Sequence, residues 1–382
     1  MIYADNAATT RISDLAFEKM LPFLREQYGN ASSQHTLGST ARRAVKQARR
    51  QVAEALGAQP PEVFFTSGGS EANSWVLRGT KEYFKGETIH VITTAIEHPS
   101  VLNACRALAP MGAEVTYLPI GNDGVVNINS LQSVMKPNTK LVSIMLANNE
   151  IGTVQPLAEI GMFLHSHGVW LHTDAVQAVG HIPVYVKELQ VDFLSASAHK
   201  FNGAKGTGFL YIRSGISLPS MVYGGEQEHG HRAGTEHVAG ITALGHALEE
   251  SISTLAAEGK KQRLLVKKTI EGLRAAIPDI QINAEHTPKL PGILNITLPH
   301  ASGEAMMHLL DLKGICVSTS SACNSGKDDP SHVLLALGLS EKQAKSSIRI
   351  SYGKYNTMED VEKIVAATAD AYEKITRKSP AT

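Results

Sequence analysis

Residues 193–200, Phe-Leu-Ser-Ala-Ser-Ala-His-Lys, indicate the architecture, because an apolar run here ends in small polar residues and a lysine. Other short runs rich in β-branched and aromatic residues surround it, and helical stretches separate most of them. This alternation predicts an α/β domain whose mostly parallel sheet has helices on both faces. Ligands of such sheets bind in loops at the carboxyl ends of the strands. The sheet is predicted to have seven strands, at 63–66, 89–92, 115–118, 141–144, 169–172, 193–194 and 208–212.

The remainder of the chain has a different pattern. Residues 39–56 are amphipathic, with Ser39 or Thr40 as the expected N-cap, and residues 240–276 predict one or two long helices. In the last third, apolar β-like runs alternate with helical stretches, which predicts a smaller α+β domain. The β-like runs are 280–283, 293–296 and 348–351, and a final helix is expected over 358–375.

The length supports two domains, since 382 residues exceed what one simple core serves. We place the larger α/β domain at residues 13–250. The smaller domain combines residues 1–12 with residues 251–382, and it carries the loop that contains Cys323.

The composition argues against several classes of function. Lys plus Arg and Asp plus Glu both number 36, so the formal net charge is +0 and no global field attracts nucleic acid or an anionic membrane. Apolar runs such as 141–147 are too short to span a bilayer, and the opening residues do not resemble a signal peptide. The cysteines are few and widely spaced, which argues against a disulfide framework. We therefore expect a cytoplasmic protein.

Two of the cysteines have the surroundings of core residues. Cys105 shares a helical face with apolar neighbours, and Cys316 falls inside a predicted strand. Cys323 differs, because residues 319–330 are mostly small and polar and contain nothing that anchors a core. We expect that segment to be mobile and exposed, which is the placement that a travelling nucleophile needs.

The residues near Lys200 make it a candidate for binding a cofactor. Its amine can form a Schiff base with an aldehyde cofactor, and a buried carboxylate at Asp174 can keep a pyridine nitrogen protonated. Ser197 and His199, next to the lysine, can bond a phosphate. These are the requirements of pyridoxal 5'-phosphate, whose ring withdraws electrons while its nitrogen is charged. Taken alone, Lys200 would be a surface charge and Asp174 a helix N-cap.

Three further loops follow predicted strands and carry candidate ligands. Residues 66–73, Thr-Ser-Gly-Gly-Ser-Glu-Ala-Asn, open a helix, so Gly69 and Ser70 can either receive an anion or form a plain capped turn. His98 can stack on a flat ring and move protons, or it can cap a helix. Asn149 can bond a ring hydroxyl or a substrate carboxylate, or it can belong to an Asx turn.

Arg349 lies inside an otherwise apolar strand. It either faces outward as a surface residue or captures an amino-acid carboxylate through two parallel hydrogen bonds. Gln177 follows Asp174 by three positions and shares its face if a helix begins there.

Together these motifs resemble the cysteine desulfurases of the NifS/IscS type, which are fold-type I pyridoxal-phosphate enzymes of the class V aminotransferase family. The resemblance extends from Tyr3 to Arg349, nearly the whole chain. The stretch 323–338 looks like the family branch with the longer, flexible cysteine loop. The most specific motifs are residues 5–10, 66–73, 148–152, 197–200 and 321–323.

The resemblance implies a role for each candidate residue. Lys200 would hold the cofactor covalently, Asp174 would pair with its ring nitrogen, and His98 would stack on the ring and shuttle protons. Cys323 would attack the sulfur of L-cysteine, which yields L-alanine and a persulfide, while Arg349 would bind the substrate carboxylate. Gln177 and Asn149 would bond the ring oxygen or the substrate. Further cofactor ligands would be Gly69, Ser70, Ser197, His199 and, across a homodimer, Thr235 of the partner subunit.

The segment 224–235 departs from the family pattern. Glu226 replaces a glycine and His229 replaces an arginine, so the subunit contacts or the cofactor entrance can differ here. The spacing of His229, His231 and His237 does not suit one rigid metal site, and we expect none.

Two other functions compete with a desulfurase that feeds an iron–sulfur scaffold protein or a thiolation acceptor. One is a selenocysteine lyase, or a cysteine or cystine lyase, of the same fold, which would keep substantial turnover without Cys323. The other is a weakly active sulfur-relay or scaffold-binding subunit, which the altered residues 226–229 suggest.

Overall fold

The computed structural model describes residues 1–319 and 329–377 and is built around a seven-stranded sheet. The strand order is β2-β8-β7-β6-β5-β3-β4; β8 runs antiparallel to both neighbours, and all other pairs are parallel. The predicted mostly parallel α/β sheet is therefore confirmed. Its strands are β2 (Val63–Thr66), β3 (Ile89–Thr94), β4 (Ala113–Leu118), β5 (Thr139–Ser143), β6 (Trp170–Asp174), β7 (Phe193–Ser197) and β8 (Gly208–Ile212).

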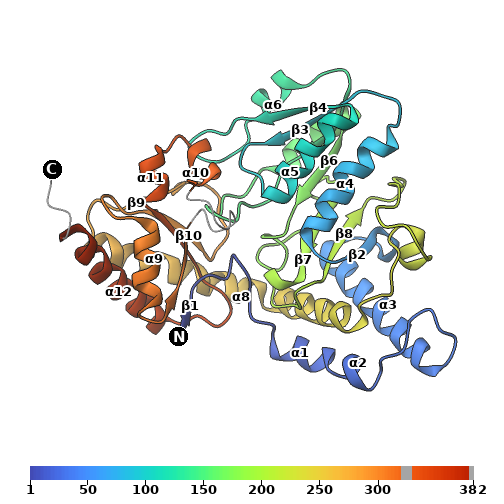
Figure 1. Ribbon diagram of the computed structural model, residues 1–382, viewed down its shortest axis with the longest axis horizontal. Helices are drawn as coiled ribbons and strands as arrows, with labels where there is room; N and C mark the ends of the chain where they lie inside the picture. Colours follow the sequence, from blue (N-terminus) through green and yellow to red (C-terminus); the bar gives the residue numbers. More distant parts are fainter. Residues whose placement is uncertain (320–328, 378–382) are drawn as a thin grey trace.

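Helices cover both faces of this sheet (Figure 1). Successive residues of β2 serve opposite faces, because Val63 and Phe65 join one apolar core and Phe64 joins another. All positions of β3, β5, β7 and β8 are buried or nearly so, which explains why these strands appear in the sequence as short, largely apolar runs. The helices between the strands are α3 (Thr36–Leu56), α4 (Gly69–Tyr83), α5 (Pro99–Leu108), α6 (Ile128–Val134) and α7 (Leu157–Ser166).

A second, antiparallel sheet belongs to the last third of the chain, with strand order β12-β13-β10-β9. A separate apolar core lies on it, and the N-terminal strand β1 joins this region by pairing in parallel with β11. The four strands of the second sheet are β9 (Gln281–Ile282), β10 (Ile293–Thr297), β12 (Ser318–Thr319) and β13 (Ser347–Ser351), and the separate pair is β1 (Ile2–Tyr3) and β11 (Ile315–Cys316). The helices over the second sheet are α9 (Gly303–Asp311) and α12 (Met358–Arg377).

One long helix, α8 (Val238–Ala276), connects the two regions. Leu244 and Leu248 on its first half belong to the core of the large sheet, whereas Leu265 and Leu273 on its second half belong to the core of the small sheet. The helix has 39 residues without interruption, so the single-helix alternative for residues 240–276 is the correct one.

Short helices complete the chain: α1 (Asp14–Met20), α2 (Pro22–Arg25), α10 (His332–Ala336) and α11 (Glu341–Lys345). Val333 and Leu334 of α10 pack into the core of the large sheet. The chain thus returns to that core after residue 329, and the boundaries at residues 12/13 and 250/251 stay a prediction. Among the described residues, no helix is both long and apolar enough to cross a bilayer.

Candidate active site

A cavity of about 750 Å³ opens where the parallel strands of the large sheet end. It brings together most of the residues that the sequence singled out, from loops after β2, β3, β5, β6 and β7 and from strand β13 of the small sheet. Thr235 is exposed and does not line this cavity, and Cys323 lies outside the described residues. The predicted residues that line it are Gly69, Ser70, His98, Asn149, Asp174, Gln177, Ser197, His199, Lys200 and Arg349.

Lys200 ends a short 3₁₀ turn that follows β7. Its Nζ donates to the carbonyl oxygens of Ala7 at 2.6 Å and Ala8 at 2.7 Å. The amine therefore points across the cavity toward the N-terminal segment, and it is half-buried rather than a solvated surface charge.

Asp174 is the last residue of β6 and is 5% exposed. Its Oδ1 accepts from the backbone N–H of Val176 at 3.0 Å, and its Oδ2 accepts from Nδ2 of Asn73 at 2.7 Å. Both oxygens thus have donors, which fix the carboxylate in one orientation at the edge of the cavity.

His98 is both a helix cap and a cavity residue, so its two readings do not exclude each other. It precedes α5, and its Nδ1 accepts from the backbone N–H of Ser100 at 3.1 Å. Burial lowers the pKa of His98, the Asp174 carboxylate opposes that shift, and the Lys200 charge adds to it. The ring is therefore held neutral near pH 7.

One end of the cavity is built to receive an anion. Gly68, with φ +151°, precedes the first turn of α4, where backbone N–H groups lack helical partners. A Cβ on Gly69 would lie 2.6 Å from Cγ2 of Val176, so only glycine fits against that side chain. Ser197 lines the same end, and burial, together with the charges of Lys200 and Lys205, lowers the pKa of His199 to about 4.

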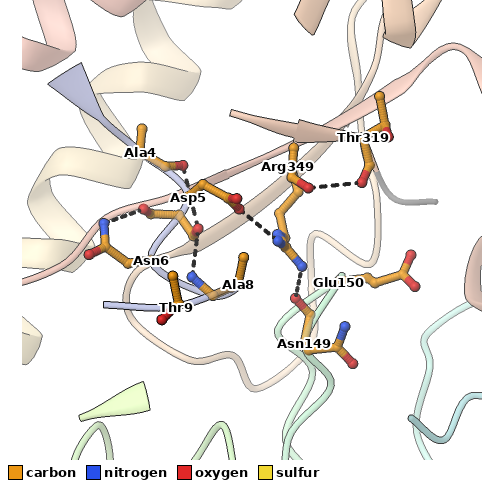
Figure 2. Close-up of polar contacts among 12 residues, drawn as sticks. Ala4, Asp5, Asn6, Ala8, Thr9, Asn149, Glu150, Thr319 and Arg349 are labelled. Carbon is orange, nitrogen blue, oxygen red and sulfur yellow. Dashed lines mark hydrogen bonds and ion pairs between the residues drawn. The ribbon is translucent and has the colours of Figure 1, made fainter. Parts of the chain in front are cut away.

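Arg349 also lines the cavity, and Figure 2 shows its polar contacts. It is 3% exposed, which excludes the outward-facing surface reading. One guanidinium nitrogen donates to the carbonyl oxygen of Asn149 at 2.9 Å, and the other donates to Oδ1 of Asp5 at 2.7 Å. Its Nε is buried and has no hydrogen-bond partner among the residues described. Each terminal nitrogen keeps a second N–H, and a substrate carboxylate is a suitable acceptor for these donors.

The N-terminal segment contributes more than the sequence motif indicated. The Ala7 carbonyl oxygen accepts from both Lys200 and Nε2 of Gln177, the latter at 2.8 Å, and Asp5 pairs with Arg349. Asn73 and Ser100 also bond site residues and were not singled out from the sequence. Asn73 lies in the 66–73 motif and Ser100 follows His98 by two, and position in those motifs was the available signal.

The described thiols lie apart from this chemistry. Cys105 is buried and burial raises its pKa to about 12, so it is a core residue as expected. Cys316 is only partly buried at the end of β11, so its placement in the core was wrong; the strand has two residues and its partner β1 covers one side. Within residues 1–319 and 329–377, no group of three or more His, Cys, Asp or Glu side chains could hold a metal ion.

The donor set fits pyridoxal 5'-phosphate. Asp174 offers a carboxylate for the ring nitrogen, Lys200 an amine for the aldehyde, and the glycine turn with Ser197 an anion site, all on one cavity. The volume of about 750 Å³ leaves room for a small amino acid beside a cofactor of that size.

Comparisons with known proteins agree with this geometry. The family model for class-V aminotransferases matches residues 2–364. A cysteine desulfurase IscS of Methanosarcina thermophila is 42% identical over 381 residues, which is 100% of this chain and 94% of that protein. A cysteine desulfurase IscS of Clostridium botulinum is 42% identical over 366 residues, covering 95% of this chain and 92% of that protein.

Solved structures give the same result. A NifS-like protein superposes with a TM-score of 0.91 at 38% identity, covering 97% of this chain and 98% of that one. The NifS-like protein of Rickettsia africae superposes with a TM-score of 0.87 at 32% identity, covering 99% of both chains. The chain therefore belongs to the class V aminotransferase family, as a pyridoxal-phosphate-dependent enzyme of the NifS/IscS type of cysteine desulfurase.

Proposed function

We propose that this enzyme converts L-cysteine to L-alanine and transfers the sulfur to Cys323 as a persulfide. The observation that carries the proposal is the single cavity that joins a lysine amine, a buried carboxylate and an imidazole to an arginine with an unused buried donor. A further solved relative, SspA in complex with cysteine, superposes with a TM-score of 0.84 at 34% identity, which supports cysteine as the substrate.

At the cofactor end, Lys200 would hold the aldehyde carbon and Asp174 the ring nitrogen. When bound, pyridoxal phosphate supplies an electron sink for negative charge at the substrate α-carbon. The anion site at the start of α4, with Gly69, Ser70, Ser197 and His199, would bind the phosphate. His199 contributes as a neutral donor, because its pKa is about 4. Gln177, which lines the cavity beside Asp174, would orient the ring or the substrate.

At the substrate end, Arg349 would fix the carboxylate of cysteine. Its Nε–H is the buried donor without a partner, and Asn149 and Asp5 hold the other two nitrogens in place. A guanidinium fixed on two sides loses little freedom when it binds, and this favours discrimination of amino acids from other thiols.

The sulfur step needs a thiolate from outside the described residues. The Cys323 thiolate would form a bond to the substrate Sγ as the Cβ–Sγ bond breaks. The electron pair of that bond returns to Cβ, and a proton converts Cβ to the methyl group of alanine. The half-buried Lys200 amine and the His98 ring are the cavity groups able to move protons at the α- and β-carbons.

We also propose a homodimer in which Thr235 of the partner subunit joins the phosphate site. Exposed apolar side chains on and beside α1 and α2 support a subunit contact there: Leu15, Phe17, Leu21, Leu24 and Tyr28. The likeness to desulfurases supports an iron–sulfur scaffold protein or a thiolation protein as the sulfur acceptor. Unpaired Cys105 and Cys316 are consistent with a reducing, cytoplasmic setting.

The altered segment 226–229 bears on the weakly active alternative. Neither Glu226 nor His229 lines the main cavity, and Glu228 between them forms an ion pair with Arg49. These replacements leave the proposed cofactor and substrate contacts intact, so we favour an active enzyme.

The test combines trapping with turnover. Borohydride reduction of the purified holoenzyme, followed by peptide mass mapping, should place the cofactor on Lys200; an adduct elsewhere, or none, would contradict the proposal. Incubation with L-cysteine should yield alanine and a persulfide on Cys323. A Cys323→Ala variant that still releases sulfide at the wild-type rate would instead identify a lyase.

A further inference from the structure

Two side chains connect Asp174 to His98: Asn73, which does not line the cavity, and Ser100, which does. Asn73 on α4 is fully buried, and its Nδ2 lies 2.7 Å from Oδ2 of Asp174 and 2.9 Å from Oγ of Ser100. Ser100 on α5 places its Oγ 2.8 Å from Nδ1 of His98. A continuous chain of hydrogen bonds therefore runs from the carboxylate to the imidazole.

The direction of each bond in this chain is fixed by chemistry. An ionised carboxylate only accepts, so Asn73 must turn its NH₂ group, and not its oxygen, toward Asp174. The second N–H of that group then donates to Ser100 Oγ. Because Ser100 Oγ accepts from Asn73, its own proton is directed to its other neighbour, Nδ1 of His98.

His98 consequently meets two donors at the same nitrogen. Nδ1 accepts from the hydroxyl of Ser100 at 2.8 Å and from the backbone N–H of Ser100 at 3.1 Å. A ring nitrogen that accepts carries no proton, so the proton of the neutral ring lies on Nε2. No partner of Nε2 is found among the described residues, which leaves that N–H for whatever occupies the cavity.

We propose that Asn73 and Ser100 are positioning residues that couple Asp174 to His98 and hold the His98 ring as its Nε2–H tautomer. His98 then presents a hydrogen-bond donor to the substrate and cofactor, and the same chain holds the Asp174 carboxylate in place. The inference deepens the proposed function and rests on it for the meaning of the cavity, but its geometry comes from contacts among the protein's own side chains.

The test is ¹⁵N NMR of the histidine-labelled holoenzyme, with the His98 signals assigned by their loss in His98→Gln. Wild-type protein should show an Nε2 that is almost fully protonated and an Nδ1 that is almost unprotonated, with the Nδ1–H tautomer as a small but measurable fraction. Ser100→Ala removes one of the two donors to Nδ1, and we expect the minor Nδ1–H tautomer to rise about fivefold. Ser100→Thr keeps a hydroxyl and should restore the wild-type spectrum.

Asn73→Ala tests the link to Asp174, because it frees the Ser100 hydroxyl to turn away from His98; the minor tautomer should rise here too. Asn103→Ala, on the exposed side of α5, is the matched control and should change nothing. A wild-type ring protonated on Nδ1, or variants with the wild-type spectrum, would overturn the proposal. Neither result depends on cysteine turnover, so an enzyme that still makes alanine would leave the proposed function standing.

Discussion

The ion pair between Arg49 and Glu228 allows a quantitative prediction about residues 224–235, the segment that departs from the family pattern. Arg49 on α3 donates to both carboxylate oxygens of Glu228, at 2.8 and 2.7 Å, and the backbone N–H of Phe65 donates to the same carboxylate at 2.9 Å. The Glu228 side chain is 4% exposed and that of Arg49 11%. This contact fastens the 224–235 segment to strand β2 and helix α3.

Arg49→Met is the informative change, because methionine fills much of the space of arginine and removes its charge. Glu228 would remain buried with one backbone donor, and breaking a buried pair on one side costs about 3–5 kcal/mol. Arg49 also donates to the carbonyl oxygen of Val63 and stacks 4.7 Å from the Phe65 ring, so the upper part of that range applies. Adding Glu228→Gln should recover part of the loss, since an amide tolerates burial better than an unpaired carboxylate.

The assay is urea unfolding followed by tryptophan fluorescence, because Trp75 on α4 and Trp170 on β6 both belong to an apolar cluster on one face of the large sheet. Arg50→Met, one position along the same helix but exposed, is the control and should change the free energy of unfolding by less than about 0.5 kcal/mol. Equal urea midpoints for Arg49→Met and Arg50→Met would refute the reasoning. So would a double variant that is no more stable than Arg49→Met.

Three further outcomes are expected. Cys323→Ala should abolish persulfide formation, measured by mass spectrometry, while the cofactor absorbance that depends on Lys200 stays unchanged. Ser331→Ala should lower the free energy of unfolding by about 1–3 kcal/mol, since it removes an N-cap and leaves buried Glu150 without the hydroxyl that bonds it at 2.5 Å. Burial raises the pKa of Glu97 to about 8, so the folded protein keeps a proton that the unfolded chain releases above the ordinary pKa of 4.5. The protonated Glu97 therefore contributes fully to stability below about pH 4.5, and this contribution is lost as the pH rises toward 8. Glutamine does not titrate, so the urea midpoint of Glu97→Gln should rise relative to that of the wild type between about pH 5 and about pH 8.

The strands of the large sheet could be predicted because a strand that is buried on both faces appears in the sequence as a short run of apolar residues. Each of the seven predicted runs falls wholly or largely within a strand. The start of α3 could not be placed in the same way. Ser39 or Thr40 was the expected cap, but the helix begins at Thr36, where Nδ1 of His35 accepts from the backbone N–H of Gly38 at 3.3 Å. An imidazole cap carries none of the usual signal of Ser, Thr, Asp or Asn.

The residues of the candidate site could be predicted in part, whereas the contacts between them could not. Residues that follow a strand, such as His98, Asp174 and Lys200, could be found because carboxyl ends of parallel strands meet at one edge. The contacts among them could not, since Asn73 and Asp174 are 101 positions apart and their bond depends on how α4 packs over β6. A buried asparagine in a helix is equally compatible with a core residue until its partner is known.

The N-terminal segment is the clearest case of function that only tertiary structure reveals. Asp5 lies beside β13 of the small sheet, where its backbone pairs with Ser351 and its side chain holds Arg349. Two residues further on, the Ala7 carbonyl oxygen accepts from Lys200, which follows strand β7 of the large sheet. One short stretch of chain thus joins the proposed substrate anchor to the proposed cofactor anchor.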